Sequence, residues 1–222
     1  MSATPEKLAA LRHLLAARFP TGLRPAGPCD GLRAGRVLGT GILSIDEATG
    51  GLPRGAVTEV VCAAPSCGGQ LLLGQLLAAT RITRTRVALI DCTDSFDPAS
   101  FDADLLAHLV WVRCATMATA LHAADLLARD ANLGLVVLDL RRAPDVDFRR
   151  TPSTHWYRLQ HAVEPTDLAF VVVTPRACVP SAQVRFALTT LHTIDALDRA
   201  RPALTAALTP LLQRHRLHSA AG

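Results

Sequence analysis

The residues best placed to do chemistry follow an apolar, strand-like run at residues 57–62 and precede a helical pattern at residues 70–81. In a parallel sheet, the loop after a central strand is a usual position for a bound ligand. Loops of the pattern GxxxxGK[ST] bind phosphate there. Their backbone amides surround the anion, their lysine reaches its terminal oxygens, and their hydroxyl group holds magnesium. Aligned on its last glycine, the loop of this chain has these residues at and beside the motif positions: Ala64, Gly68, Gly69, Gln70 and Leu71.

The last two of these residues remove the chemistry of the motif. Gln70 can form hydrogen bonds but has no charge to neutralise phosphate, and Leu71 cannot ligate a metal ion. The only lysine of the chain is Lys7, and no arginine lies between Arg54 and Arg81. We therefore predict an ordinary strand-turn-helix connection, with no bound nucleotide, cofactor or metal ion and no catalytic residue.

The composition is that of one globular domain with short extensions. The chain has 222 residues, of which 50% are hydrophobic and 19% charged, and its formal net charge is +4. Charged residues or prolines interrupt every apolar run, and no export signal begins the chain, so we expect a cytoplasmic location without membrane contact. The six cysteines form no CxxC pair. We expect Cys62, Cys92 and Cys114 to be small buried hydrophobic residues rather than metal or redox groups.

Short apolar runs alternate with helical patterns through the middle of the chain. Strands are predicted at residues 57–62, 86–91, 109–112, 135–140 and 168–174, with a further strand or hairpin at 184–194. Helices are predicted at residues 70–81, 98–108, 116–129 and 154–162. Strands that are apolar throughout and separated by helices are typical of parallel sheets covered on both faces. The predicted fold class is α/β, with a mostly parallel central sheet.

The two ends of the chain have different patterns. Residues 5–19 suit a helix, a Gly/Pro-rich segment follows, and residues 203–216 are again helical in pattern with an interruption at Pro210. The predicted organisation is an N-terminal helix at 1–20, a linker at 21–35, a core domain at 36–195 and a C-terminal helical extension at 196–222.

Each end helix could pack on its own core or supply a contact for another protein. An apolar stripe on the first helix and an apolar and basic group in the last one are the candidate partner-binding residues. They are Leu8, Leu11, Leu15 and Phe19, and Leu211, Leu212, Arg214 and Arg216.

The loop and its flanks resemble the RecA superfamily. Residues 40–55, TGILSIDEATGGLPRG, match the pattern in which TGxxxLD and GGLPxG precede the first core strand of that family. Similar matches follow at residues 57–61, 87–98, 109–140, 168–176 and 184–188. The resemblance extends over about residues 36–190 and implies a RecA-like core with a degenerate phosphate loop.

The resemblance also indicates where the other nucleotide-handling residues would lie. Thr93 stands at the position of the catalytic glutamate and cannot orient or deprotonate an attacking water molecule. Asp139 occupies the aspartate position of the second nucleotide motif, while Thr174 and Pro175 replace a polar sensor pair. With Gln70 and Leu71, these departures imply that ATP hydrolysis is lost.

In RecA, two loops line the DNA. The segment matching the second loop, residues 175–183, is too short to wrap a strand. The segment matching the first, residues 141–157, combines arginines with aromatic residues, which suits single-stranded DNA. Its candidate DNA contacts are Arg149, Arg150 and Trp156, although Trp156 could instead begin a helix packed on the core. The separate C-terminal domain of RecA has no counterpart, so we do not expect a recombinase.

Within the superfamily, the short length, N-terminal helix and degenerate loop are most similar to the ImuA family of bacterial mutagenic repair cassettes. This resemblance implies a non-enzymatic scaffold, induced by DNA damage in the SOS response, that works in translesion synthesis. Its implied partners are ImuB (a Y-family polymerase homologue), an error-prone DNA polymerase and RecA, with self-association through RecA-type packing surfaces. Two alternatives remain: a SulA-type division inhibitor that binds FtsZ, and a DNA-binding RecA paralogue that still binds ATP.

Overall fold

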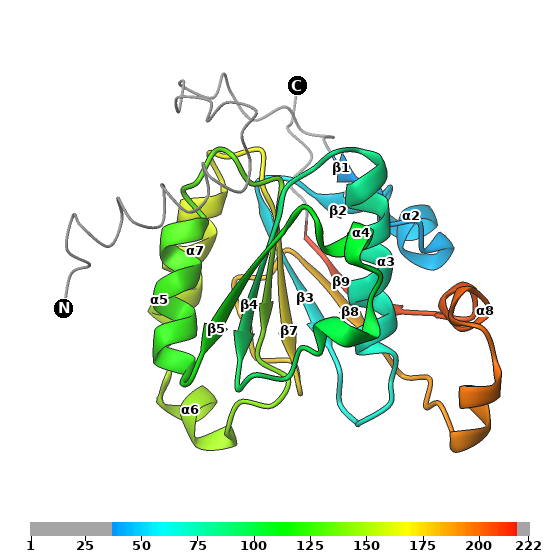
Figure 1. The fold of residues 1–222 in the computed structure, drawn as a ribbon. Helices are drawn as coiled ribbons and strands as arrows, with labels where there is room; N and C mark the ends of the chain where they lie inside the picture. The colour runs from blue at the N-terminus through cyan, green and yellow to red at the C-terminus, as the bar shows by residue number, and fades with distance from the viewer. Residues whose placement is uncertain (1–36, 217–222) are drawn as a thin grey trace.

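The computed structural model describes residues 37–216, which form a central sheet with helices on both faces (Figure 1). Seven strands lie in the order β5-β4-β6-β7-β3-β8-β9, and a separate pair, β1-β2, is antiparallel. Every neighbouring pair in the large sheet is parallel except β8 and β9. The strands are β1 Val37–Leu38, β2 Leu52–Pro53, β3 Ala56–Val61, β4 Val87–Cys92, β5 Leu109–Cys114, β6 Leu135–Asp139, β7 Ala169–Thr174, β8 Val184–Ala187 and β9 Leu211–His215.

The helices form two layers that bury the two faces of the sheet. Buried residues of α2 and α3 contribute to the core on one face, and those of α5 and α7 contribute to the core on the other. The helices are α2 Leu43–Thr49, α3 Gly69–Ile82, α4 Ala103–Leu106, α5 Met117–Leu127, α6 Asp145–Arg150, α7 Ser153–Val163 and α8 Arg201–Ala206, with 3₁₀ turns η1 Pro98–Ser100 and η2 Ile194–Asp198.

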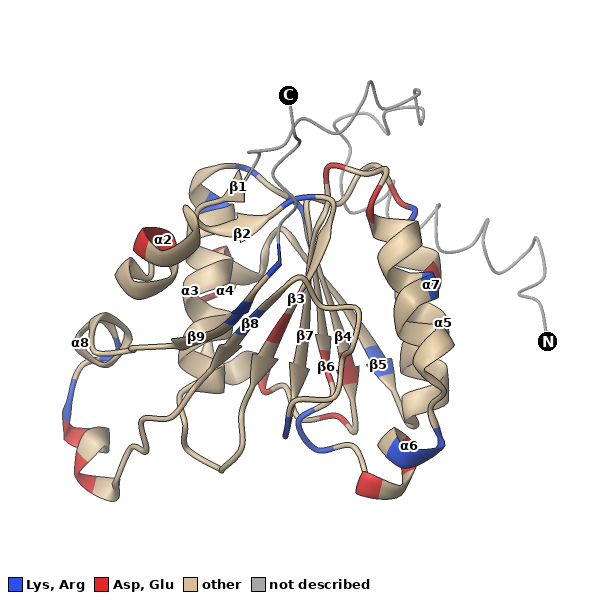
Figure 2. Cartoon of the chain, turned by 180° about the vertical axis from the view of Figure 1, so that it is seen from behind, with Lys and Arg blue, Asp and Glu red and all other residues tan. Residues whose placement is uncertain are grey.

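The local sequence explains where these elements begin and end. The four central parallel strands are almost continuous runs of branched apolar residues, as strands buried on both faces must be. Helix α5 begins at a capping box, in which Thr116 and Thr119 satisfy each other's backbone N–H groups. In Figure 2 charged positions are frequent in the connecting segments, and a few lie within strands, such as β3, β8 and β9.

The sequence prediction of an α/β fold with a mostly parallel central sheet is confirmed. The five predicted strands and the helices at 70–81, 116–129 and 154–162 are all present. The helix predicted at 98–108 is reduced to η1 and the short α4. The helix predicted at 5–19 and the linker at 21–35 lie outside the described residues. Within residues 37–216, no helix is long and apolar enough to cross a membrane.

The prediction of a helical C-terminal extension was wrong in its second half. Helix α8 ends at Ala206, and the residues after Pro210 form β9, which pairs antiparallel with β8. Pro210 cannot continue a helix, and β8 offers an apolar edge on which Leu212 packs against the core. The backbone N–H of Arg216 also donates to the carbonyl of Gln183 at 2.7 Å. This segment therefore completes the central sheet.

Candidate functional site

A cleft of about 950 Å³ opens beside the loop that joins β3 to α3. The loop and the start of α3 form one wall, and the segment that includes η2 and α8 contributes the other. Residues from both walls line it, among them Cys62, Cys67, Gln70, Arg141, His192 and Ile194. This is the position at which the sequence placed the degenerate phosphate loop.

The C-terminal part of the chain is packed directly on this loop. Gly68 precedes α3 with a φ of 93°, and a Cβ atom there would lie 2.5 Å from Leu208 Cδ2. The backbone N–H of His192 donates to the carbonyl of Ser66 at 3.0 Å. Only glycine combines this left-handed backbone with so close a neighbour. The segment around His192 and Leu208 thus packs against the loop at Ser66 and Gly68.

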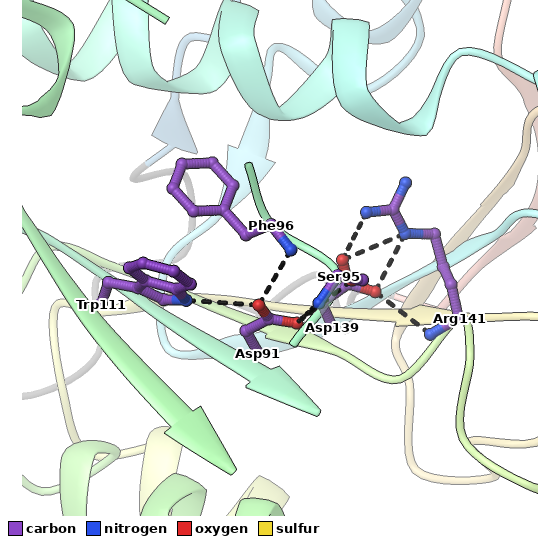
Figure 3. A network of polar contacts seen from close by, with 6 residues as sticks. All are labelled: Asp91, Ser95, Phe96, Trp111, Asp139 and Arg141. Atoms are coloured by element: carbon purple, nitrogen blue, oxygen red, sulfur yellow. Dashed lines mark hydrogen bonds and ion pairs between the residues drawn. The ribbon is translucent and has the colours of Figure 1, made fainter. Parts of the chain in front are cut away.

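Asp139, at the end of β6, is held by Arg141 two residues later (Figure 3). The carboxylate is almost completely buried, and Arg141 Nε donates to its two oxygens at 2.9 and 3.1 Å. A second guanidinium nitrogen, Nη2, also donates to the carboxylate. Burial lowers the pKa of Arg141, but its hydrogen bonds to Asp139 and the charge of that carboxylate outweigh burial and raise the pKa.

The guanidinium of Arg141 also lies against the first turn of α3. A Cβ atom on Gly69 would stand only 2.4 Å from Arg141 Nη1. In a working phosphate site, a cation in this region comes from the loop lysine and the aspartate helps to hold magnesium. Here the cation comes from the segment after β6 and neutralises the aspartate instead. This feature was missed from the sequence; its signal was the arginine pair that follows Asp139.

Asp91, at the end of β4, is also fully engaged. One oxygen accepts from the backbone N–H of Ser95 at 2.9 Å, and the other accepts from the N–H of Phe96 at 2.9 Å and from Trp111 Nε1 at 3.2 Å. Thr93, at the predicted position of a catalytic glutamate, is exposed and has a φ of 79°. Among residues 37–216, no group of three or more potential metal ligands comes together.

A buried carboxylate on β3 fixes the short loop at residues 175–183. Glu59 is completely buried and lies 2.5 Å from Arg185 Nε of β8. It also accepts from the backbone N–H groups of Cys178 and Val179, at 2.7 and 3.1 Å, and from the Thr174 hydroxyl at 3.0 Å. Thr174 is therefore turned toward Glu59. The loop that would be the second DNA loop of a RecA-like core is tied to the sheet.

The predicted DNA contacts are only partly at the surface. Arg149 and Arg150 are exposed at the end of α6. Trp156 is 3% exposed and belongs to the core below α7, so its ring cannot stack on a base and the prediction for this residue was wrong. Trp156 lies in the first turn of α7, which begins at Ser153, and its large ring is buried on the core.

The predicted C-terminal contact residues lie on β9 and just after it, and they divide into two kinds. Leu211 is 56% exposed, and Arg216 is also exposed. Leu212 packs against the core, and Arg214 donates to the carbonyls of Pro180 and Ala182, at 3.2 and 3.3 Å. Leu212 and Arg214 therefore serve the fold itself. Leu8, Leu11, Leu15 and Phe19 lie outside the described residues.

Comparison of the chain with known protein families and with curated proteins found no match.

Proposed function

We propose that this chain is a non-catalytic, RecA-like accessory protein that acts by binding other proteins in error-prone translesion DNA synthesis. The observation that carries the first half of the proposal is the pairing of Arg141 with Asp139 against Gly69. It places a permanent cation on the carboxylate that a magnesium nucleotide would need. Gln70 and Leu71, at the start of α3, supply neither a charge nor a hydroxyl group in exchange.

The sheet order and the position of the cleft support the RecA-like part of this proposal. A mostly parallel sheet with a glycine-containing loop between β3 and α3 is the arrangement in which the motif residues were aligned. The sequence resemblance to the ImuA family supplies the biological setting. The partners we propose are an ImuB-type Y-family polymerase homologue, RecA and an error-prone polymerase.

The packing of the C-terminal segment on the loop before α3 favours protein binding over nucleotide turnover. Leu208 and His192 lie on the loop, so the C-terminal segment occupies space beside the phosphate-binding position. Near this segment, Leu191 and Ile194 are exposed to solvent by 62% and 79%. Contact with another protein at this point would remove both side chains from water.

Calorimetry with ATP and magnesium tests the loss of nucleotide binding. We expect the full chain to give no binding heat. Micromolar affinity would overturn the non-catalytic assignment and favour a RecA paralogue that retains ATP.

A pull-down with the ImuB-type protein, RecA and FtsZ tests the partners. Deleting the C-terminal segment is a poor probe, because α8 and β9 are part of the fold. We instead compare Leu211→Glu, on the exposed side of β9, with Ile82→Glu, which alters an 83% exposed residue at the end of α3. Loss of the ImuB-type protein only with Leu211→Glu supports the proposal. Capture of FtsZ alone would favour the SulA-type alternative.

A further inference from the structure

A groove runs along two helices on the face of the sheet opposite α3. Helices α5 and α7 pack against each other there, and α6 lies near the ends at which both begin (Figure 1). Two cavities of about 520 and 390 Å³ follow these helices, and Arg158 of α7 lines both. The larger is bounded by residues of all three helices, the smaller by α7 and by Arg129 just after α5. We call the two cavities together the α5–α7 groove.

Helical spacing places basic residues along both walls of the groove. Asp125 and Arg129 are four residues apart and lie on one stripe at the end of α5. Arg158 and His161 are three residues apart and lie on one stripe of α7. The charged residues that line the groove are Arg129, Arg150, Arg158 and Asp147. The walls therefore carry more positive than negative charge.

One carboxylate is shared by two of these arginines. Arg129 Nη2 and Arg158 Nε lie 3.5 and 3.6 Å from the same oxygen of Asp125, Oδ1. Within residues 37–216 that oxygen accepts no hydrogen bond. The side chains of Arg129 and Arg158 are 59% and 57% exposed. Because each guanidinium has five N–H donors, both arginines can bind a further carboxylate that enters the groove.

Apolar residues also line the groove between the arginines. Ala118, Leu121 and Pro152 line the larger cavity, and Tyr157 and Ala162 line the smaller. A phosphodiester strand has no aliphatic group to place on such a surface, and a single tyrosine ring, 49% exposed, is offered to its bases. A peptide can place apolar side chains there while its carboxylates reach the arginines. The mixture of apolar and basic residues therefore favours a protein segment over a nucleic acid.

The charge of the groove also argues against the ends of this chain as its occupant. Residues 1–36 contain six basic and two acidic side chains, and residues 217–222 contain no acidic side chain. A segment with an excess of basic residues is repelled by arginines. The matching carboxylates must come from another protein.

We propose that the α5–α7 groove binds an acidic segment of a partner protein, in which carboxylates alternate with apolar side chains. The carboxylates pair with Arg129, Arg150 and Arg158, and the apolar side chains cover Leu121 and the ring of Tyr157. This contact rests on the proposed role in binding other proteins but not on the translesion setting. It also uses a surface that the contact proposed for β9 does not.

Fluorescence anisotropy with the full chain and a labelled peptide of three Leu-Glu-Glu-Leu repeats tests the chemistry of the groove. We expect saturable binding that weakens as salt screens the charges. Replacing every glutamate of the peptide by glutamine, or every leucine by serine, should abolish it. The proposal is overturned if the peptide does not bind, or if it binds equally well after either replacement.

A variant that gains affinity locates the binding site. Asp125→Asn removes the carboxylate that Arg129 and Arg158 share, so the peptide should bind more tightly, by roughly two- to five-fold. Damage to the fold cannot produce such a gain. Asp104→Asn is the matched control, because it removes the same charge from the exposed partner of Arg81 at the end of α3. Equal gains in the two variants would show that net charge alone attracts the peptide and would overturn the site.

Charge reversal and two competing occupants complete the test. Arg158→Glu should abolish peptide binding, while Arg81→Glu should leave it unchanged. A labelled thymidine oligonucleotide that binds more tightly than the peptide, and loses affinity in Arg158→Glu, would assign the groove to nucleic acid instead. Dimerisation of the chain that Arg158→Glu abolishes would assign it to a second copy. The pull-down with the ImuB-type protein can fail while the peptide still binds, so the two proposals fail separately.

Discussion

Asp91 and Asp139 lie directly opposite each other in the parallel register of β4 and β6, yet each carboxylate is bound by a different set of donors. Asp91 holds the loop after its own strand through the N–H groups of Ser95 and Phe96. Asp139 holds Arg141. Two neighbouring carboxylates at the carboxyl edge of a parallel sheet could otherwise share a cation. Here donors within the protein bind both carboxylates. Asp91 thereby fixes the loop after β4, and Asp139 fixes the segment after β6.

Substitution of Arg141 should destabilise the fold. Arg141→Ala leaves the buried Asp139 carboxylate without its cation, and we expect a loss of about 3 kcal/mol in the free energy of unfolding. Urea denaturation measures this change. Arg81→Ala is the matched control, because Arg81 pairs with Asp104 in an exposed bidentate contact that solvent screens. It should change the free energy of unfolding far less than Arg141→Ala. Equal losses in the two variants would show that Asp139 does not depend on Arg141.

Removing Glu59 should release the loop at residues 175–183. Glu59→Ala leaves Arg185 and the N–H groups of Cys178 and Val179 without their buried acceptor. We expect a loss of about 4 kcal/mol, and faster hydrogen exchange at the Cys178 and Val179 amides. Glu47→Ala, at an exposed position on α2, should change neither. Unchanged exchange in Glu59→Ala would contradict the anchoring role.

His108 should make the protein less stable below neutral pH. Burial lowers its pKa, and Arg81 lowers it further, while Asp104 acts in the opposite direction. As the pH falls through the ordinary histidine range, the unfolded chain takes up a proton that the folded chain does not. The free energy of unfolding should therefore fall with pH from about 6.5 downward. In His108→Gln, unfolding measured between neutral and mildly acidic pH should show a shallower slope. The same slope in both proteins would contradict this assignment.

Gly68 should not tolerate a side chain. Gly68→Ala would place its Cβ against Leu208 while keeping a left-handed backbone, and should cost roughly 1–3 kcal/mol. Gly39→Ala is the control, since a Cβ at Gly39 has no neighbour within 4 Å. Thermal unfolding separates the two. A neutral Gly68→Ala would mean that the segment around Leu208 moves aside easily.

The regular patterns of the sequence predicted most of the central sheet. Runs such as 135–140 and 168–174 contain so many branched apolar residues that only a buried strand accommodates them. The loop before α3 was also located correctly, because its glycines separate a strand pattern from a helix pattern. What these patterns could not give was strand β9. Its segment LLQRH has no strong period of its own, and β8 decides its conformation.

The contacts of the candidate site were largely beyond the reach of the sequence. The contact between Arg141 and Gly69, and that between Leu208 and Gly68, join segments that no local pattern links. One signal was present in VTEVV at residues 57–61, where a glutamate is the single charge in a mostly apolar strand. A charge in such a strand must find a partner when it is buried. The partner, Arg185, could not be named before the order of the strands was known.

The position of β3 between β7 and β8 has a consequence for how the chain reaches this structure. Glu59 and Thr174 are 115 residues apart in sequence, and their contact can form only after β7 has docked on β3. Such long-range pairings raise the contact order and slow the search for the native state. Until β8 has also docked on β3, Glu59 has no Arg185 beside it. A partly assembled sheet that lacks β8 therefore leaves the Glu59 carboxylate without its cation, which disfavours that intermediate. Folding should consequently populate the complete sheet cooperatively.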